Sequence, residues 1–319
     1  MTLPPPDVTV VIPNRDQGEF LAAAIDSALA DRNLHVEVIV VDDGSSDVTP
    51  AVLARYGRRI RSLESGGAGA CRARNIGLAA AGARFVKFLD ADDFLLPGAL
   101  AAQVAWMDRH GAADTCVCGD VRWVDAGGAP LPPPPAPAAG LSEAERMVLH
   151  APLTASPLHR VELVRRVGGF DERVPRGQEY DLHVRMWLDG VRFHYLAGEV
   201  YAYRQHGAGR ISGRDADAAV ARGRLASLER IVALAERRFG TPLPADLAGA
   251  LARQFWMIGR RSVQSGVAPV AAGFFEVARR LDGRVCEGSA AYRMCCAVFG
   301  PIWGESMLLR AKRLLGSGS

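Results

Sequence analysis

The 319-residue sequence predicts an α/β fold, in which a mostly parallel sheet is flanked by helices and followed by a helical C-terminal region. Short β-branched runs alternate with segments whose apolar residues recur at helical spacing, a pattern typical of βαβ units. Beyond the stretch 207–216, which is rich in Gly, Ser and Asp, only helical periodicity continues. We therefore expect a first domain over 1–212, with halves at 8–125 and 141–212, and a helical region over 213–319.

The elements of the first half follow from their apolar patterns. The run 8–13 is β-branched, short and ended by Pro13, which predicts a buried strand. Segment 17–30 has its apolar residues at helical spacing, and a second strand begins at Val36 and ends in acids and a glycine turn. The same reasoning predicts a helix over 48–57, a strand over 60–65, a glycine-rich loop over 66–70, a helix over 71–81, a strand over 84–90 and a helix over 94–107.

The later segments are less regular. The stretch 130–140 is rich in proline, which excludes a helix or a central strand and predicts a surface loop with polyproline character. A ligand for an SH3-type domain is the alternative interpretation of this stretch. Helical periodicity predicts helices over 216–240, 248–266 and 268–283.

The composition excludes several classes of protein. Hydrophobic residues make up 49% and charged residues 23%, an ordinary globular balance, and a net charge of +3 without a basic run argues against a nucleic-acid partner. The six cysteines have neither C-x-x-C spacing nor a histidine cluster, so we expect reduced thiols in a cytoplasmic protein. The N-terminus lacks the basic region of a signal peptide, and no apolar stretch reaches the roughly 18 residues that span a bilayer. We expect a soluble protein, or one that is peripheral at the inner face of the cell membrane.

Polar clusters follow three of the predicted strands. They lie at Asn14 to Asp16, Asp42 to Asp47 and Asp90 to Asp93. In open α/β sheets, ligands bind beyond the carboxyl ends of the strands. Three polar strand ends, far apart in sequence, are therefore expected to converge on one ligand-binding edge.

The pair Asp90 and Asp92 forms a D-x-D motif directly after an apolar strand. Crowded carboxylates at a buried strand end need a positive partner, and carboxylate oxygens are suitable ligands for Mg²⁺ or Mn²⁺. Such an ion is often held by one or two carboxylates together with substrate phosphates. We expect Asp93 to act instead as the cap of the helix that follows, or to support the ligating residues from behind.

Two further segments suit a nucleotide. Asp43, at a strand end, could accept hydrogen bonds from a base or a ribose, whereas the turn after it, with Ser46 and Asp47 as helix caps, needs no ligand. In the loop 66–77, glycines allow close approach of the backbone to a ligand. Basic and amide side chains follow in that loop and could bind a nucleotide or neutralise phosphate; they are Arg72, Arg74 and Asn75. The loop matches neither the P-loop nor the dinucleotide-binding pattern.

Taken together, these motifs resemble glycosyltransferase family 2. The similar segments are VTVVIPNRDQGEFLAAAIDSAL, VEVIVVDDGSSD, GAGACRARNIGLAAAGARFVKFLDADD, GGFDE, QEYDLHVR and YAYRQH, in the family's order over roughly 8–212. The resemblance implies a GT-A fold and a nucleotide-diphospho-sugar donor. It also implies an inverting, metal-dependent transfer to an acceptor hydroxyl.

The resemblance also implies roles for residues of the donor half. Asp43 would contact the nucleotide base, and Pro13 and Asn14, on a loop that includes Asp16, would line its pocket. Asp90 and Asp92 would contact the ribose and hold the Mn²⁺ or Mg²⁺ ion of the diphosphate. His206 would lie near that metal or the diphosphate, or would be an ordinary loop histidine. Arg204 and Arg210 would bind the diphosphate or lie at the surface, and the segment 207–213 would close over the donor.

The acceptor half departs from the family pattern. Where the family often has an E-D pair whose aspartate is the general base, this chain has Gln178 and Glu179, followed by Tyr180 and Asp181. Glu179 would then be the base, with Asp181 as the second candidate. The alternative for Glu179 is a purely structural role, because an acid near a helix N-terminus is favourable.

The function that follows is sugar transfer in cell-surface glycan or polysaccharide biosynthesis, with a glycan or lipid-linked acceptor. The alternatives are a sugar-phosphate nucleotidyltransferase, which should have a glycine-rich basic segment where this chain has PNRDQGEF, or a non-catalytic nucleotide-sugar-binding module. The tail 305–319 is apolar on one face and basic on the other, so it either contacts anionic lipid or packs on its own domain. The sequence does not specify the donor sugar or the oligomeric state.

Overall fold

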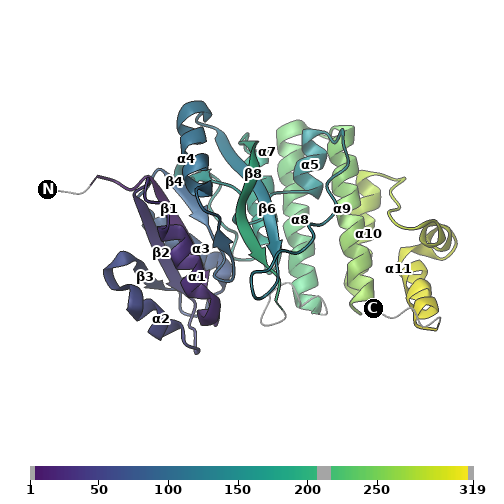
Figure 1. Ribbon diagram of the computed structural model, residues 1–319. Coiled ribbons are helices and arrows are strands. Elements are labelled where there is room, and N and C mark those ends of the chain that lie inside the picture. Colours follow the sequence, from purple (N-terminus) through teal and green to yellow (C-terminus); the bar gives the residue numbers. More distant parts are fainter. Residues whose placement is uncertain (1–3, 207–216, 315–319) are drawn as a thin grey trace. The chain divides into compact units, whose positions relative to one another are not determined.

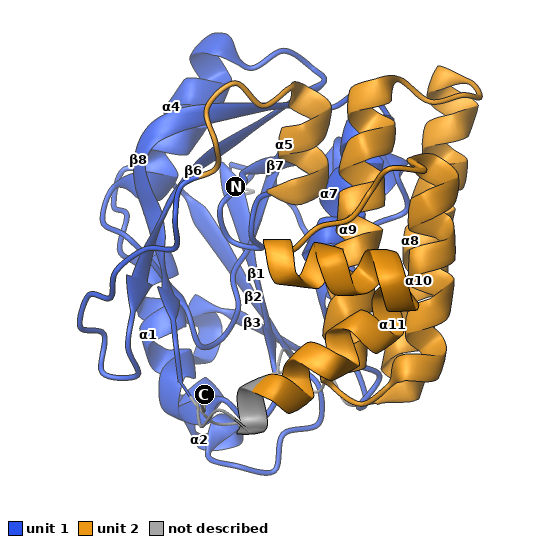
Figure 2. Cartoon of the chain, turned by 90° about the vertical axis from the view of Figure 1, so that its right-hand side faces the viewer, with its two compact units in different colours: residues 1–136, 152–172, 178–209 blue, residues 137–151, 173–177, 210–319 orange. Residues whose placement is uncertain are grey.

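The computed structural model describes residues 4–206 and 217–314, with side chains described as far as residue 311. The chain divides into two compact units (Figure 2). Unit 1 comprises residues 1–136, 152–172 and 178–209; unit 2 comprises residues 137–151, 173–177 and 210–319.

The two units are not separated by a single boundary at residue 212, as expected, because each unit consists of several segments of the chain. Segments 137–151 and 173–177 group with the C-terminal helices rather than with the α/β domain. The first of these contains helix α5 (Glu143–Leu149), which packs against α9 (Ala245–Gln264). Glu145 at the start of α5 also forms an ion pair with Arg253. The partner of α5 therefore lies about 100 residues later in the chain, and this is why its local pattern does not assign it to unit 2.

Unit 1 is built on a five-stranded sheet in the order β3-β2-β1-β4-β7 (Figure 1). All neighbouring strands are parallel except β7, which is antiparallel to β4. The register pairs Asn14 with Asp42, so two of the polar strand ends lie side by side at the carboxyl edge. The predicted α/β fold with a mostly parallel sheet is confirmed. The strands are β1 (Val8–Asn14), β2 (Val36–Asp42), β3 (Arg61–Glu64), β4 (Phe85–Phe88) and β7 (His159–Arg160).

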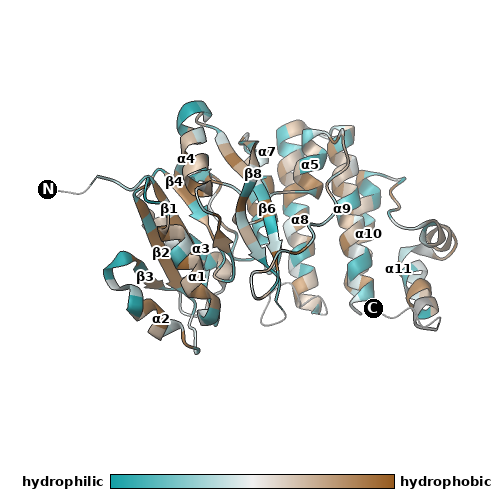
Figure 3. Cartoon of the chain, in the orientation of Figure 1, coloured by the Kyte–Doolittle hydropathy of each residue, from teal (hydrophilic) through white to brown (hydrophobic). Residues whose placement is uncertain are grey.

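The strands of this sheet are strongly hydrophobic (Figure 3). Because alternate residues of a strand point to opposite sides, helices cover both faces of the sheet. Val10 and Ile12 of β1 pack in one core cluster with α1, whereas Val11 packs in another with α3. Helix α3 approaches β1 very closely at Gly77, where an added Cβ would lie 2.3 Å from a methyl carbon of Val11. The helices of this region are α1 (Gly18–Leu29), α2 (Thr49–Tyr56) and α3 (Ala70–Ala80), with a short 3-10 helix at Gly57–Arg59.

A second sheet of unit 1 has the order β5-β8-β6, with β6 parallel and β5 antiparallel to β8. The helix that was predicted over 94–107 begins only at Ala99, and its first two predicted residues form strand β5 instead. Phe94 and Leu95 pair with β8, and Gly98, in a left-handed conformation, precedes the helix. The remaining elements of unit 1 are β5 (Phe94–Leu95), α4 (Ala99–His110), β6 (Thr115–Val124), α6 (Val161–Arg166), α7 (Gln178–Leu188) and β8 (Arg192–Arg204).

Unit 2 is helical, as the periodicity predicts. Its core contains aromatic pairs between α9 and α10, in which Phe255 packs on Phe274 and Trp256 packs on Phe275. No helix among the described residues is both long and apolar enough to cross a membrane. Besides α5 and α9, the helices are α8 (Ala218–Phe239), α10 (Ala268–Leu281) and α11 (Ala290–Leu314).

A buried polar network lies within unit 1. The ammonium group of Lys87 on β4 donates hydrogen bonds to Gln103 Oε1 (2.7 Å) and to the carbonyl oxygen of Ser156 (3.0 Å). The Nε2 atoms of His159 and His183 lie 3.1 Å apart. Burial lowers the pKa of Lys87 to about 7 and that of His183 to about 4, and it also lowers the pKa of His159 well below its usual value.

These depressed pKa values predict how the stability of the fold depends on pH. Between about pH 4 and 6.5 the unfolded histidines bind protons that the folded ones do not, so stability falls as the pH falls through this window. Lys87 extends the same trend upward from about pH 7, because unfolded lysine stays protonated to about pH 10.4. Buried thiols with raised pKa values oppose this trend in both proteins, so the test is a comparison: between pH 7 and 8.5 the Tm of the wild type should rise relative to that of Lys87→Met. If thermal melts show that the Tm of the two proteins changes equally with pH, a depressed pKa of Lys87 is contradicted.

Candidate active site

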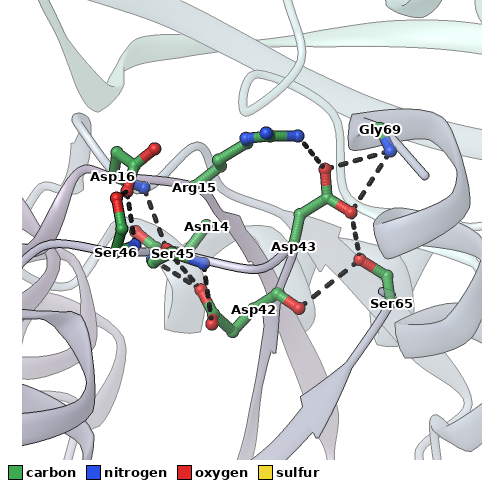
Figure 4. A network of polar contacts seen from close by, with 9 residues as sticks. All are labelled: Asn14, Arg15, Asp16, Asp42, Asp43, Ser45, Ser46, Ser65 and Gly69. Atoms are coloured by element: carbon green, nitrogen blue, oxygen red, sulfur yellow. Dashed lines mark hydrogen bonds and ion pairs between the residues drawn. The ribbon is translucent and has the colours of Figure 1, made fainter. Parts of the chain in front are cut away.

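The first part of the site joins the ends of β1 and β2 (Figure 4). The side-chain amide of Asn14 donates to Asp42 Oδ1 (3.2 Å) and to the hydroxyl oxygens of Ser45 and Thr49, each at 3.0 Å. Its carbonyl oxygen is buried and accepts no hydrogen bond from any described residue. Asn14 therefore fixes the loop after β2 and retains an acceptor for a ligand at this edge.

Asp43 lies at the centre of the next group of contacts. It is buried, and its carboxylate accepts hydrogen bonds from the Ser65 hydroxyl (2.5 Å) and from the backbone N–H of Gly69 (3.0 Å). Arg15 lies 3.5 Å away on the other side of the carboxylate (Figure 4). Asp43 thus connects the ends of β2 and β3 to the glycine-rich loop, which is the place where the resemblance puts a nucleotide base.

Asp16 and Asp47 hold neighbouring loops together. Asp16, whose φ of 51° is in the left-handed region, accepts a hydrogen bond from the backbone N–H of Ser46 (2.7 Å). Asp47 accepts from the backbone N–H groups of Gly18 (2.7 Å) and Thr49 (2.9 Å), at the starts of α1 and α2. Asp47 therefore serves two helix starts, whereas Ser46 contacts Asp16 rather than capping a helix.

The positive partner of Asp90 is Arg74 of α3. The buried guanidinium donates to Asp90 Oδ1 at 2.6 Å and, through its other amino group, to Gln178 Oε1 at 2.7 Å. Burial opposes the charge of Arg74, but attraction by Asp90, and more weakly by Glu179, raises its pKa overall. Arg74 therefore connects the D-x-D motif to the first residue of α7.

Asp92 meets His206 at the end of β8. The distance from His206 Nε2 to Asp92 Oδ2 is 2.9 Å, and the imidazole packs at 4.8 Å on the ring of Phe20. Nδ1 of His206 is buried and has no hydrogen-bond partner among the described residues. A carboxylate and an imidazole at this distance suit a divalent ion. Within the described residues, however, no three His, Cys, Asp or Glu side chains are grouped to hold a metal alone. The residues therefore fit an ion whose coordination is completed by phosphate oxygens.

Of the two roles expected for Asp93, the helix cap is wrong. Its carboxylate is buried and accepts a hydrogen bond from the backbone N–H of Arg204 at 2.8 Å. The helix that it was expected to cap begins six residues later, so the carboxylate is available to join β8 to the D-x-D loop instead.

Three residues expected to bind the nucleotide or diphosphate make contacts within the protein instead. Arg204 donates to the carbonyl oxygens of Asp92 (2.8 Å) and Ala126 (2.6 Å), and its guanidinium lies over two phenylalanine rings. The amide of Asn75 both donates to and accepts from the backbone of Phe170. Arg72 is exposed and lies 3.5 Å from Glu172. Arg210, with the expected closing segment, lies outside the described residues.

The two candidate bases lie in the first turn of α7 but differ in environment. Asp181 is buried and accepts a hydrogen bond from Arg185 (2.7 Å), which in turn donates to the carbonyl oxygens of Val167 and Gly169. Glu179 is partly exposed and directly follows Gln178, the residue bonded to Arg74. This arrangement favours Glu179 over Asp181 as a proton acceptor. The sequence had not indicated the contacts of Ser65 with Asp43, of Phe20 with His206 or of Gln178 with Arg74, because the partners are distant in the chain.

Comparison with known proteins bears on this site. Residues 9–138 match the model of a family described as glycosyl transferase family 2. Residues 9–138 are a family 2 glycosyltransferase domain. The expected resemblance is thereby confirmed for the part of the chain that carries Asn14, Asp43, Arg74 and the D-x-D motif.

Curated relatives of this family 2 domain include an uncharacterised glycosyltransferase of Rickettsia bellii (strain RML369-C), 30% identical over 57% of the chain and 27% of that protein. Another is the succinoglycan biosynthesis protein ExoO of Rhizobium meliloti (strain 1021), 39% identical over 34% of the chain and 31% of that protein. The matches thus span about a third or less of the length of these two relatives.

Solved structures show the same fold. Residues 1–349 of S. aureus TarS, in complex with UDP-GlcNAc, align over 90% of this chain and 92% of that one with a TM-score of 0.58 at 17% identity. The mannosyltransferase PcManGT of Pyrobaculum calidifontis, in complex with GDP-Man and Mn²⁺, aligns over 98% of this chain and 88% of that one, also with a TM-score of 0.58 at 17% identity. The predicted GT-A fold of the family 2 glycosyltransferases is confirmed.

Proposed function

We propose that this protein transfers a sugar from a nucleotide-diphospho-sugar to an acceptor hydroxyl, with a divalent metal ion and with inversion at the anomeric carbon. The observation that carries the proposal is the bridge of Arg74 between Asp90 and Gln178. It connects the D-x-D motif, where the donor diphosphate is expected, to the helix that bears Glu179. The D-x-D motif is thereby linked to the turn of α7 in which Glu179 follows Gln178.

The donor would lie along the carboxyl edge of the parallel sheet. Asp43 and the glycine-rich loop suit a base, and the unpaired carbonyl oxygen of Asn14 suits a donor group of the nucleotide. TarS, in complex with UDP-GlcNAc, and PcManGT, in complex with GDP-Man, support a nucleotide-diphospho-sugar without specifying which.

Asp92 and His206 would hold the metal ion together with the diphosphate, and Asp90 would contribute to the same end of the donor site. The family match and the Mn²⁺ complex of PcManGT support Mn²⁺ or Mg²⁺. A bound divalent ion would neutralise charge that develops on the departing diphosphate. Arg74 would meanwhile keep Asp90 in a fixed position through their 2.6 Å contact.

Glu179 would accept the proton of the acceptor hydroxyl as the new bond to the anomeric carbon forms and the bond to the diphosphate oxygen breaks. Attack from the face opposite to the leaving group inverts the configuration. The relative that acts in succinoglycan biosynthesis supports an acceptor in polysaccharide building, either a glycan or a lipid-linked glycan.

The test of this function uses the full chain with a panel of UDP- and GDP-sugars in the presence of Mn²⁺, Mg²⁺ or EDTA. We expect metal-dependent binding of one donor class by calorimetry, sugar transfer or slow donor hydrolysis by chromatography, and an inverted anomer by NMR. A retained anomeric configuration would contradict the proposed mechanism, and the absence of metal-dependent binding to any donor would contradict the proposed function.

Asp92→Ala should weaken metal-dependent donor binding by about 10-fold or more, since it removes one ligand and the partner of His206. The measurement is the Kd of the donor in Mn²⁺ and in EDTA. The control is Asp189→Ala, which removes an aspartate from an exposed ion pair with Arg166 and should leave the Kd unchanged. Equal donor affinities of Asp92→Ala and wild type in Mn²⁺ would remove Asp92 from the metal site.

A further inference from the structure

Helix α11 is anchored to unit 2 through one side. It consists of two helical segments that meet at Gly300, whose φ is 77° and ψ is 168° (Figure 1). In the second segment the buried carboxylate of Glu305 accepts hydrogen bonds from Arg260 (2.6 Å) and Gln264 (2.7 Å) of α9. In the first segment the ring of buried Tyr292 lies 4.0 Å from the guanidinium carbon of Arg260. Both segments are therefore held in place by α9.

Both segments of α11 also carry exposed apolar side chains. Met294 is 72% exposed, Val298 is 70% exposed and Trp303 is 64% exposed, and Phe299 and Met307 are also exposed. Met294 and Val298 are four residues apart, as are Trp303 and Met307, so each segment presents its apolar residues on one face. Most of the large exposed hydrophobic side chains among the described residues belong to this single helix.

The exposed charges of α11 itself are all positive. Arg293 and Arg310 are exposed, and Lys312 and Arg313 follow in the sequence. Glu305 is the single acidic residue between 290 and 314, and it is buried against Arg260. Bulky apolar side chains, a tryptophan and arginines without an exposed acid form the pattern of a helix that lies in the surface of an anionic bilayer.

We propose that α11 is the membrane-docking surface of this protein and that its partner is a bilayer containing anionic lipid. Trp303 and Met307 would enter the boundary between head groups and acyl chains, while Arg310 would remain at the level of the lipid phosphates. A symmetric dimer through the same face would place the arginines of the two copies near one another, which disfavours a second copy as the partner. The proposal concerns a site separate from the donor site and does not depend on sugar transfer.

The experiment is co-sedimentation of the full chain with vesicles of phosphatidylcholine alone or with about one third phosphatidylglycerol. We expect binding to the anionic vesicles that weakens with added salt, and at least a 10-fold loss of binding in the double variant Trp303→Glu, Met307→Glu. The matched control is Phe239→Glu, which replaces an exposed aromatic residue of α8 in the same unit and should bind as the wild type does. Arg310→Glu is expected to weaken binding to anionic vesicles more than binding to neutral ones.

Circular dichroism establishes that each variant is folded before binding is compared. The proposal is overturned if the wild type fails to bind anionic vesicles, or if the folded double variant binds them as the wild type does. It is also overturned if light scattering shows a dimer that the double substitution dissociates while vesicle binding is absent, since α11 would then contact a second copy.

Discussion

Glu179→Gln is expected to reduce the rate of sugar transfer by about 10²- to 10⁴-fold while it leaves the Kd of the donor within about two-fold of wild type. The amide keeps the size of the side chain but cannot accept the proton of an acceptor hydroxyl. Donor binding should persist because the contacts of Asp43, Asn14 and Asp92 belong to other elements. The measurements are kcat from a transfer assay and the Kd of the donor from calorimetry.

Glu162→Gln is a matched control for this substitution. Glu162 is likewise an acid in the first turn of a helix of unit 1 but is more exposed than Glu179, and its replacement should leave kcat unchanged. Full transfer activity in Glu179→Gln would assign the base to another residue. A loss of donor binding equal to the loss of transfer would instead give Glu179 a role in the donor pocket.

Arg74→Met is expected to lower the free energy of unfolding by about 3 kcal/mol, at the lower end of the range for breaking a buried ion pair because Asp90 keeps some access to solvent. The change leaves Asp90 and Gln178 without the donor groups that hold them at 2.6 and 2.7 Å. Urea unfolding measures the loss. Arg84→Met is the control, because Arg84 and Asp108 lie at the same 2.6 Å distance but are exposed, and we expect less than about 1 kcal/mol there.

Arg74→Lys separates stability from positioning. A lysine keeps the charge near Asp90, but its single ammonium group does not reproduce the two-sided contact of the guanidinium. We therefore expect Arg74→Lys to recover most of the stability that Arg74→Met loses. Its kcat should nevertheless stay below that of the wild type, because Gln178 and the adjacent Glu179 lose their connection to the D-x-D motif. If Arg74→Lys restores stability and kcat together, charge alone is sufficient and the positioning role is incorrect.

The sequence predicted the strands β1 to β4 and the edge at which they end, because both follow from local patterns, whereas it assigned the residues of β5 to a helix. The apolar runs before Asn14, Asp43 and Asp90 are buried strands, and the parallel register brings their ends together. The resemblance to family 2 further located these residues in a donor site. Local apolar periodicity and an ordered set of motifs were therefore sufficient for the fold and for the positions of the acids.

The contacts of these residues could not be predicted in the same way. Asp93 was expected to cap a neighbouring helix, but its partner Arg204 is 111 residues away. Arg74 was expected to contact a nucleotide or phosphate, and its protein partner Gln178 is 104 residues away. A motif indicates that a polar side chain is needed at a position, whereas the pairing depends on which distant segments the fold brings together.

The close contact of Gly77 with Val11 has a consequence for how such a site can change over evolution. Helix α3 begins with the residues that follow the glycine-rich loop and carries Arg74, so its distance from the sheet sets where both lie. That distance is limited by a side chain of β1 and by the missing Cβ at residue 77, and not by any charged group. Donor specificity could therefore diverge through polar substitutions around an unchanged framework, whereas a larger residue at position 77 would displace every group on the helix at once.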